Sequence, residues 1–216
     1  MNYEIARRQM LNQQIRAWDV LDERVLDVLR TTPREAFVPE SERDLAFADA
    51  EVPLAHGQCM MAPKVEARLL QELAIEPTDQ ALEVGTGSGY LAACLGRLAA
   101  GVTSLEIFAD LSEAAAARLG QTGIDNVALK VDDALRTNLA LHFDVIAVTA
   151  SVPRLTDHFI RLLNPGGRLF IVVGRPPVME AILVRLHADG SISEKSLFET
   201  LLTPMINADQ SEPFVL

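Results

Sequence analysis

The chain has 216 residues, enough for one domain with an extension, and 49% of them are hydrophobic, so we expect a packed core. Its formal net charge of −11 argues against binding to DNA or RNA, whose backbones call for a basic surface. The two cysteines form no paired motif and the four histidines have no metal-ligand spacing, so no disulfide and no metal site are predicted. Without a visible signal peptide or membrane span, the sequence favours a cytoplasmic protein.

Residues 1–78 are predicted to form a mostly helical N-terminal cap and not an independent domain. Apolar positions at helical spacing indicate helices over residues 4–17, 21–29 and 65–73. Between the last two lies an irregular stretch rich in proline. Its final part, residues 56–64, carries several side chains that could face a ligand.

Residues 79–206 are predicted to form a Rossmann-like α/β core, followed by a poorly ordered tail over residues 207–216. Short apolar strands alternate with helices, which indicates a mostly parallel sheet covered on both faces. The expected strands are 81–84, 102–105, 127–131, 145–149 and 168–173, and the expected helices are 90–99, 111–119 and 155–163. Residues 164–167 are interpreted as a helix-ending turn. Two further strands, 181–186 and 197–202, are expected to pair antiparallel at the sheet edge.

The most informative stretch is a glycine-rich turn between the first strand and the first helix of this core. Three glycines alternate with small polar residues, which brings backbone close to a ligand and aims a helix N-terminus at it. The spacing Gly-x-Gly-x-Gly differs from the dinucleotide pattern Gly-x-Gly-x-x-Gly, so a nicotinamide cofactor is disfavoured. It looks like the first motif of S-adenosylmethionine-dependent methyltransferases; a tight turn without ligand is the alternative. The candidate cofactor-binding residues here are Glu83, Gly85, Thr86, Gly87, Ser88 and Gly89.

Acidic residues follow the next two strands, where the ligand crevice of a parallel sheet lies. Glu106, followed by Ile107, could accept hydrogen bonds from the two hydroxyls of a ribose. Asp133, followed by Ala134, could accept from the amine of an adenine, with Asp132 as its competitor. The structural alternatives are a solvated acid at a strand end for Glu106 and a helix-capping aspartate for Asp133.

Taken together, these features resemble the protein-L-isoaspartate (D-aspartate) O-methyltransferase family over about residues 7–206. Besides the glycine motif, the resemblance rests on residues 20–26, 33–39, 143–150, 166–174 and 203–205. It implies S-adenosyl-L-methionine as cofactor, S-adenosyl-L-homocysteine as product, and methylation of isoaspartyl carboxylates in damaged proteins, which starts their repair. The partner would be a protein or peptide that carries isoaspartyl residues; the oligomeric state is not implied.

The departures from the family pattern fall on the substrate side, where we place Gln58, Cys59, Met60, Met61 and Thr149. Met61 stands at the position of the serine that lies beside the methyl acceptor in that family. A carboxylate acceptor is already ionised at neutral pH, so no general base is required, and no catalytic residue is assigned. Losing one hydrogen-bond donor could cost about 1–3 kcal/mol of orientation. Two alternatives therefore stay open: a different, more apolar small acceptor, or a cofactor-binding protein that no longer catalyses.

Overall fold

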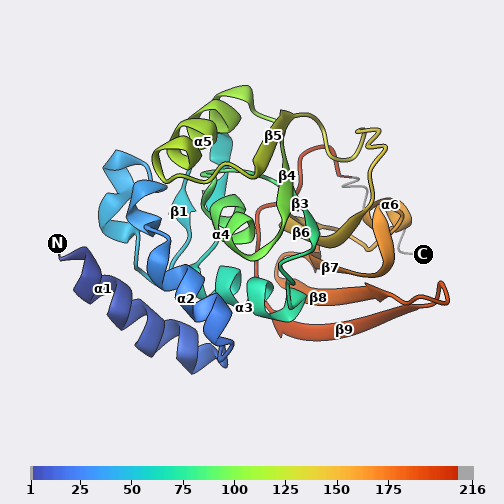
Figure 1. Ribbon diagram of the computed structural model, residues 1–216, viewed down its shortest axis with the longest axis horizontal. Coiled ribbons are helices and arrows are strands. Elements are labelled where there is room, and N and C mark those ends of the chain that lie inside the picture. The colour runs from blue at the N-terminus through green and yellow to red at the C-terminus, as the bar shows by residue number, and fades with distance from the viewer. Residues whose placement is uncertain (1, 209–216) are drawn as a thin grey trace.

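A seven-stranded sheet forms the centre of the computed structural model, which describes residues 2–208 (Figure 1). The strand order is β5-β4-β3-β6-β7-β8-β9. The strands are β3 (Gln80–Val84), β4 (Gly101–Glu106), β5 (Val127–Val131), β6 (Phe143–Val152), β7 (Leu163–Arg175), β8 (Val178–Leu186) and β9 (Ile192–Glu199). Neighbours from β5 to β7 are parallel, and β7, β8 and β9 pair antiparallel. The predicted Rossmann-like sheet with antiparallel edge strands is confirmed.

The chain order reverses at β3, because β4 and β5 lie on one side of it and β6 and β7 on the other. In open parallel sheets a crevice for ligands forms at such a switch point, beyond the carboxyl ends of the strands. The turn that follows β3 is the glycine-rich segment, so the topology places that segment at the switch point.

Helices cover both faces of the sheet and its N-terminal flank. They are α1 (Tyr3–Met10), α2 (Glu23–Thr31), α3 (Pro63–Leu73), α4 (Tyr90–Leu98), α5 (Ala109–Gln121) and α6 (Asp157–Ile160). After α1 the chain continues helically, as a π turn over Leu11–Ile15 and a 3-10 turn over Arg16–Trp18. Short 3-10 turns at Arg34–Ala36, Glu40–Leu45 and Ala55–Gly57, and a small hairpin of β1 (Val52–Pro53) and β2 (Cys59–Met60), complete the N-terminal part.

The N-terminal helices share a hydrophobic core with the sheet. Met10 and Leu26 belong to the same buried cluster as Ala81 of β3 and Phe170 of β7. A second cluster, on the other face, contains Leu82 and Val84 of β3, Ile146 of β6 and Leu169 of β7. Since side chains alternate along a strand, each central strand contributes to both clusters. The division of the chain at residue 78 stays a prediction.

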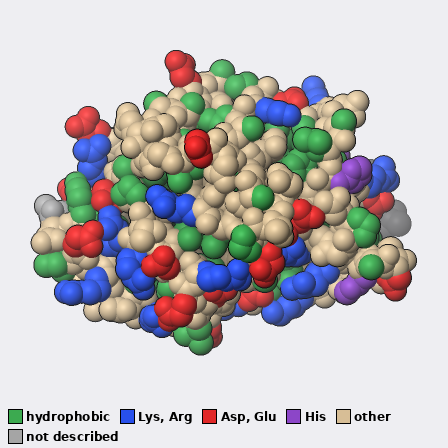
Figure 2. Space-filling model, viewed as in Figure 1, with side chains coloured by type: hydrophobic (Ala, Val, Ile, Leu, Met, Phe, Trp, Pro, Cys, Tyr) green, Lys and Arg blue, Asp and Glu red, His purple; other side chains and the backbone are tan. Residues whose placement is uncertain are grey.

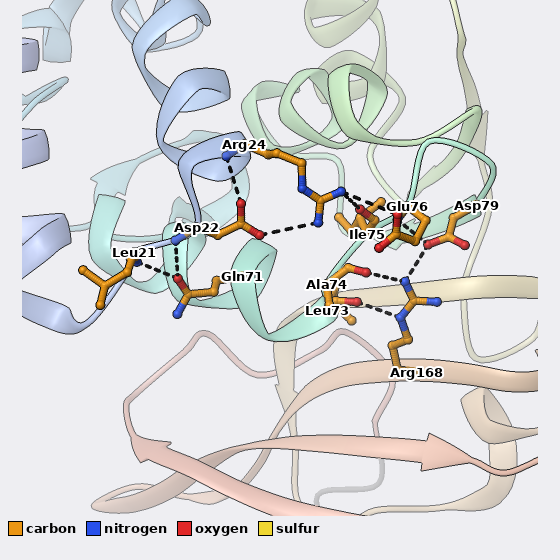
Figure 3. A network of polar contacts seen from close by, with 10 residues as sticks. All are labelled: Leu21, Asp22, Arg24, Gln71, Leu73, Ala74, Ile75, Glu76, Asp79 and Arg168. Carbon is orange, nitrogen blue, oxygen red and sulfur yellow. Dashed lines mark hydrogen bonds and ion pairs between the residues drawn. The ribbon is translucent and has the colours of Figure 1, made fainter.

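Polar contacts fix α3 between the cap and the sheet (Figure 3). Arg168 of β7 donates to the carbonyl oxygens of Leu73 and Ala74, each at 2.7 Å, and its guanidinium pairs with Asp79 at 2.6 Å. On the other side of α3, the side-chain oxygen Oε1 of Gln71 accepts from the backbone N–H groups of Leu21, at 2.7 Å, and Asp22, at 3.0 Å, which lead into α2. The carbonyls that end α3 are thus satisfied by the sheet.

Several boundaries differ from the sequence-based expectation. The predicted helix over residues 155–163 shrinks to the four residues of α6, because β7 already begins at Leu163. Residues 164–167, predicted as a helix-ending turn, form a bulge inside β7, since Phe143 faces Leu163 while Val145 faces Arg168. The second edge strand is Ile192–Glu199 and not 197–202.

Of the predicted tail 207–216, only the first two residues are described, and residues 209–216 lie outside the described part. Asn207 was expected to be poorly ordered, but its side-chain amide donates to Asp133 Oδ2 at 2.9 Å. The backbone N–H of Ala208 donates to the Met205 carbonyl oxygen at 3.2 Å.

The surface mixes charges of both signs. Figure 2 shows acidic and basic side chains interspersed on the face viewed, without a continuous basic field. Within residues 2–208 no helix has the length and apolar character needed to cross a bilayer. Over the same residues, no three His, Cys, Asp or Glu side chains gather as metal ligands would.

Candidate ligand-binding site

The glycine turn after β3 adopts a backbone that glycine alone tolerates well. Gly85, Gly87 and Gly89 have φ values of +94°, +52° and +88°. At Gly85 there is also no room for a side chain, because a Cβ would lie 2.3 Å from Thr149 Oγ1. The turn is held to β4 by the backbone N–H of Gly85, which donates to the Leu105 carbonyl oxygen at 2.9 Å.

The third glycine of the motif has a packing role. Gly89 precedes α4, and a Cβ there would lie 3.0 Å from the Cβ of Ala115 on α5. Its missing side chain therefore lets the two helices approach. Gly89 is absent from the walls of both hollows described below, so the structure does not bring this predicted cofactor-binding residue to the crevice.

Glu106, the last residue of β4, is anchored against the glycine turn. Its Oε2 accepts from the Gly87 N–H at 2.8 Å, and its Oε1 accepts from the Phe108 N–H at 3.1 Å. The side chain is largely buried yet lines the crevice. A carboxylate has more lone pairs than these two hydrogen bonds use, so Glu106 can still accept hydrogen bonds from the hydroxyls of a diol.

A hollow lies at the carboxyl ends of β3, β4 and β6. It brings together predicted residues from five separate segments. Those on its wall are Gln58, Cys59, Gly85, Gly87, Glu106, Ile107, Asp133, Ala134 and Thr149. Sequence reasoning missed Phe108, Thr203, Met205 and Ile206, which also line it. Phe108 follows Glu106 by two residues, which is a signal that could have been used.

Both aspartates after β5 line this hollow, and both already serve local turns. Asp132 accepts from the Asp133 N–H at 2.8 Å and from the Thr137 hydroxyl at 2.5 Å. Asp133 accepts from the Leu135 N–H at 3.0 Å, and its other oxygen meets Asn207. The helix-capping role weighed for Asp133 is not found, because no helix lies in the described segment between β5 and β6; its half-buried carboxylate caps a turn and faces the hollow.

A second, smaller hollow of about 280 Å³ lies below the glycine turn. Predicted residues on its wall are Cys59, Met60, Met61, Glu83, Gly85, Thr86, Gly87, Ser88 and Thr149. Cys59, Gly85, Gly87 and Thr149 line both hollows. A ligand with two differently polar ends could therefore place one end in each hollow and its centre beside these shared residues.

Glu83 is the acid at the base of the smaller hollow. It is fully buried, accepts from the Ser104 hydroxyl through Oε2, and has no hydrogen-bond partner at Oε1. Burial raises the pKa of the Glu83 carboxyl to about 8, against the opposing hydrogen bond from Ser104. An unpartnered acceptor this deep suits a ligand that donates a hydrogen bond.

Glu66 supplies a second buried acid to the same hollow, and sequence reasoning missed it. Its carboxylate pairs with Arg34, whose Nη2 also donates to the Met61 carbonyl oxygen at 2.8 Å. Burial raises the pKa of Glu66 to about 7, and Arg34 opposes that shift. Arg34 thus fixes the backbone of the segment that carries Met61.

Met61 itself packs inward. Its side chain is 4% exposed and belongs to the core cluster shared by the cap and the sheet. Cys59, two residues earlier, lines both hollows and contacts Thr203, with 3.3 Å between Sγ and Oγ1. Burial raises the pKa of the Cys59 thiol to about 11, so this group is neutral near pH 7.

Thr149 lies within β6 and not at its end, since the strand continues to Val152. Its hydroxyl donates to the carbonyl oxygens of Val84 and Gly85, each at 2.9 Å. The residues just before Ser151 bulge away from β7, because Ala147 faces Phe170 while Ser151 faces Val172. This bulge moves Thr149 over the glycine turn.

A histidine from the cap lies at the rim of the larger hollow. The His56 ring stacks on Phe108, with 4.1 Å between ring centroids and 7° between planes. Its Nε2 lies 2.9 Å from the carboxylate oxygens of Asp110, and this hydrogen bond lowers the pKa of Asp110. The loop of residues 55–57 is thereby tied to the start of α5.

The residues present fit an adenosyl sulfonium. A side-chain-free turn approaches the ligand, Glu106 offers acceptors for a diol, and Glu83 has an unpartnered buried oxygen. The described walls of both hollows carry no Lys or Arg, which suits a cationic ligand. The fit rests on chemistry and shape alone.

The comparisons with known proteins agree with one another. The family model described as protein-L-isoaspartate(D-aspartate) O-methyltransferase matches residues 6–210. A protein-L-isoaspartate O-methyltransferase from Rhodopseudomonas palustris is 39% identical over 210 residues, covering 94% of this chain and 96% of that relative. One from Koribacter versatilis is 37% identical over 213 residues, with 98% and 95% covered. A crystal structure of such an enzyme from Plasmodium falciparum, in complex with S-adenosyl-L-homocysteine, shares the fold, with a TM-score of 0.80 at 21% identity, covering 95% of this chain and 98% of that one.

Proposed function

Because the chain belongs to the protein-L-isoaspartate (D-aspartate) O-methyltransferase family, we propose that it transfers a methyl group from S-adenosyl-L-methionine to the carboxylate of L-isoaspartyl residues in damaged proteins. One observation carries the proposal for this chain: Gly85, Gly87, Glu106 and Asp133 line a single crevice at the switch point of the sheet. The product of the cofactor is S-adenosyl-L-homocysteine.

In this proposal the larger hollow takes the nucleoside. Glu106 accepts from the ribose hydroxyls and Asp133 from the adenine amine, while Ile107 and Ala134 pack against the base. The amino-acid end extends into the smaller hollow, where the free oxygen of Glu83 faces the ammonium group. Thr86 and Ser88 line that hollow as well.

When bound, the cofactor supplies an electrophilic methyl group on a sulfonium. The chain supplies position, because an ionised carboxylate needs no general base at neutral pH. The shared residues Cys59, Gly85, Gly87 and Thr149 surround the place where the reacting atoms would meet. Since the Cys59 thiol is neutral there, it does not compete with the acceptor for the methyl group.

Two assays test the proposal. Titration calorimetry with S-adenosyl-L-methionine measures cofactor binding, and labelled methyl transfer to an isoaspartyl peptide measures the reaction. The matched control is the same peptide with a normal aspartyl residue. We expect transfer to the isoaspartyl peptide alone; binding of the cofactor without any transfer would refute the proposed substrate.

A second candidate is transfer to a different, more apolar small acceptor. The observation that favours it is the burial of Met61, which leaves no hydroxyl at the position where the family has serine. Methyl transfer to other acceptors, with none to the isoaspartyl peptide, would establish this candidate. A chain that binds the cofactor and transfers to nothing would be the non-catalytic homologue considered from the sequence.

We also propose a reducing, cytoplasmic location, because Cys59 and Cys94 are both free thiols. Cell fractionation with a specific antibody would test it. Recovery of the chain in an oxidising compartment would contradict it.

A further inference from the structure

The hydroxyl groups around the two hollows are mostly engaged with the protein. Thr149 donates to two carbonyl oxygens of the glycine turn. Thr86 Oγ1 lies 2.5 Å from Ser104 Oγ, and the buried Ser88 Oγ accepts from the Tyr90 N–H at 3.3 Å. Thr203 differs, because among the described residues its hydroxyl meets only a thiol.

The Thr203 hydroxyl is only weakly engaged by its partner. Either atom of the Cys59–Thr203 contact can be the donor, and a thiol is both a weak donor and a weak acceptor. Thr203 also lines the larger hollow, so its hydroxyl can turn from the thiol to a stronger acceptor there. The half-buried Thr203 side chain is thus a neutral donor that a carboxylate can recruit.

The backbone of Thr203 is fixed against the end of β6. Its carbonyl oxygen accepts from the Ser151 N–H at 3.0 Å, and Ser151 Oγ donates to the Leu202 carbonyl oxygen at 3.0 Å. Ser151 also forms a parallel bridge with Pro204. The hydroxyl is therefore held by the sheet and not by a free loop.

A neutral donor suits this place better than a cation would. A Lys or Arg beside the acceptor would repel the sulfonium and reduce the nucleophilicity of the carboxylate. A hydroxyl can hold one carboxylate oxygen while the other attacks the methyl group. The walls near Cys59 offer this chemistry through Thr203, whereas Met61, which lines the smaller hollow, carries no donor.

We propose that the Thr203 hydroxyl donates a hydrogen bond to the carboxylate of the methyl acceptor. The inference rests on the proposed function and deepens it. Thr203 is an acceptor-binding residue, because it would touch the substrate.

The test compares Thr203→Val, which keeps the shape but removes the donor, with Thr203→Ser, which keeps the hydroxyl. For Thr203→Val we expect the KM for an isoaspartyl peptide to rise about ten- to a hundredfold, because a hydrogen bond to a charged group is lost. The peptide Kd measured by calorimetry in the presence of S-adenosyl-L-homocysteine should rise in parallel. The cofactor Kd should stay within about twofold, and Thr203→Ser should stay close to the wild type.

Cys59→Ala provides a second variant that leaves Thr203 in place. We expect its peptide KM to rise less than that of Thr203→Val, since the Thr203 hydroxyl remains in place. An active wild type with an unchanged KM in Thr203→Val, at unchanged cofactor affinity, would overturn the inference alone. A wild type that binds the cofactor but does not methylate the isoaspartyl peptide would overturn the proposed function and the inference together.

Discussion

Replacing Glu83 by glutamine should change how the stability of the protein depends on pH. The carboxyl is fully buried, and its pKa rises from an ordinary value of 4.5 to about 8. Between these values the folded state binds more protons than the unfolded state, so the stabilisation present at low pH is lost as the pH rises. From pH 5 to pH 9 this one group lowers the free energy of unfolding by about 4 kcal/mol.

Glutamine is uncharged and close in shape to the protonated acid, so Glu83→Gln should lose this pH dependence. Urea unfolding of both proteins without cofactor, at pH 5, 7 and 9, measures the free energies. We expect the difference between variant and wild type to shift in favour of the variant as the pH rises. Acids that do not interact with Glu83 cancel in that difference, whereas Glu66 and Glu106, whose charges raise its pKa, contribute to it. Parallel profiles for the two proteins would show that Glu83 does not titrate as burial implies.

Further variants probe the crevice and the core. Glu106→Gln should weaken the binding of S-adenosyl-L-methionine about ten- to a hundredfold by calorimetry and should lower the melting temperature, because its amide nitrogen cannot accept from one of the two backbone N–H groups. Gly85→Ala should destabilise the fold by about 1–3 kcal/mol in urea, because its Cβ would lie 2.3 Å from Thr149 Oγ1. Met61→Ser should cost about 2–5 kcal/mol of stability by the same measurement, since Met61 fills the core. Although it places the family's serine at this position, it should not raise methyl transfer. Arg168→Met should lower stability by about 3–5 kcal/mol, because it breaks a buried ion pair and leaves backbone carbonyls unpaired; an unchanged melting temperature would contradict this.

The sheet could be predicted because its central strands are apolar on both faces and are punctuated by helices. The strand 127–131 and the turn after residue 84 lie where the sequence placed them. Such patterns are local, so each can be interpreted without knowledge of the rest of the chain.

The failures at residues 164–167 and at the second edge strand have a different cause. A proline and two glycines indicate a turn, but pairing with β6 on either side of them, at Leu163 and Arg168, carries the strand through as a bulge. For β9, the exposed polar half from Ile192 to Ser196 carries little apolar signal, and its position follows from register with β8.

Only the side of the crevice that is formed by the carboxyl ends of the strands could be predicted from the sequence. Glu106 and Asp133 are found by the rule that ligands bind at the carboxyl ends of parallel strands. Thr203 and Glu66 are missed by that rule, since they come from segments that reach the crevice by tertiary packing. The Cys59–Thr203 contact joins residues 144 positions apart.

That long separation means that the two sides of the crevice need not fail together. The nucleoside side is built on β3 and β4 at the middle of the sheet, whereas the acceptor side depends on a short segment clipped to Ser151. Detaching that clip exposes Leu202 and Met205 but leaves the strands paired, so it should open at a lower denaturant concentration than the sheet. At low denaturant concentration the protein would then still bind the cofactor but no longer bind the damaged protein.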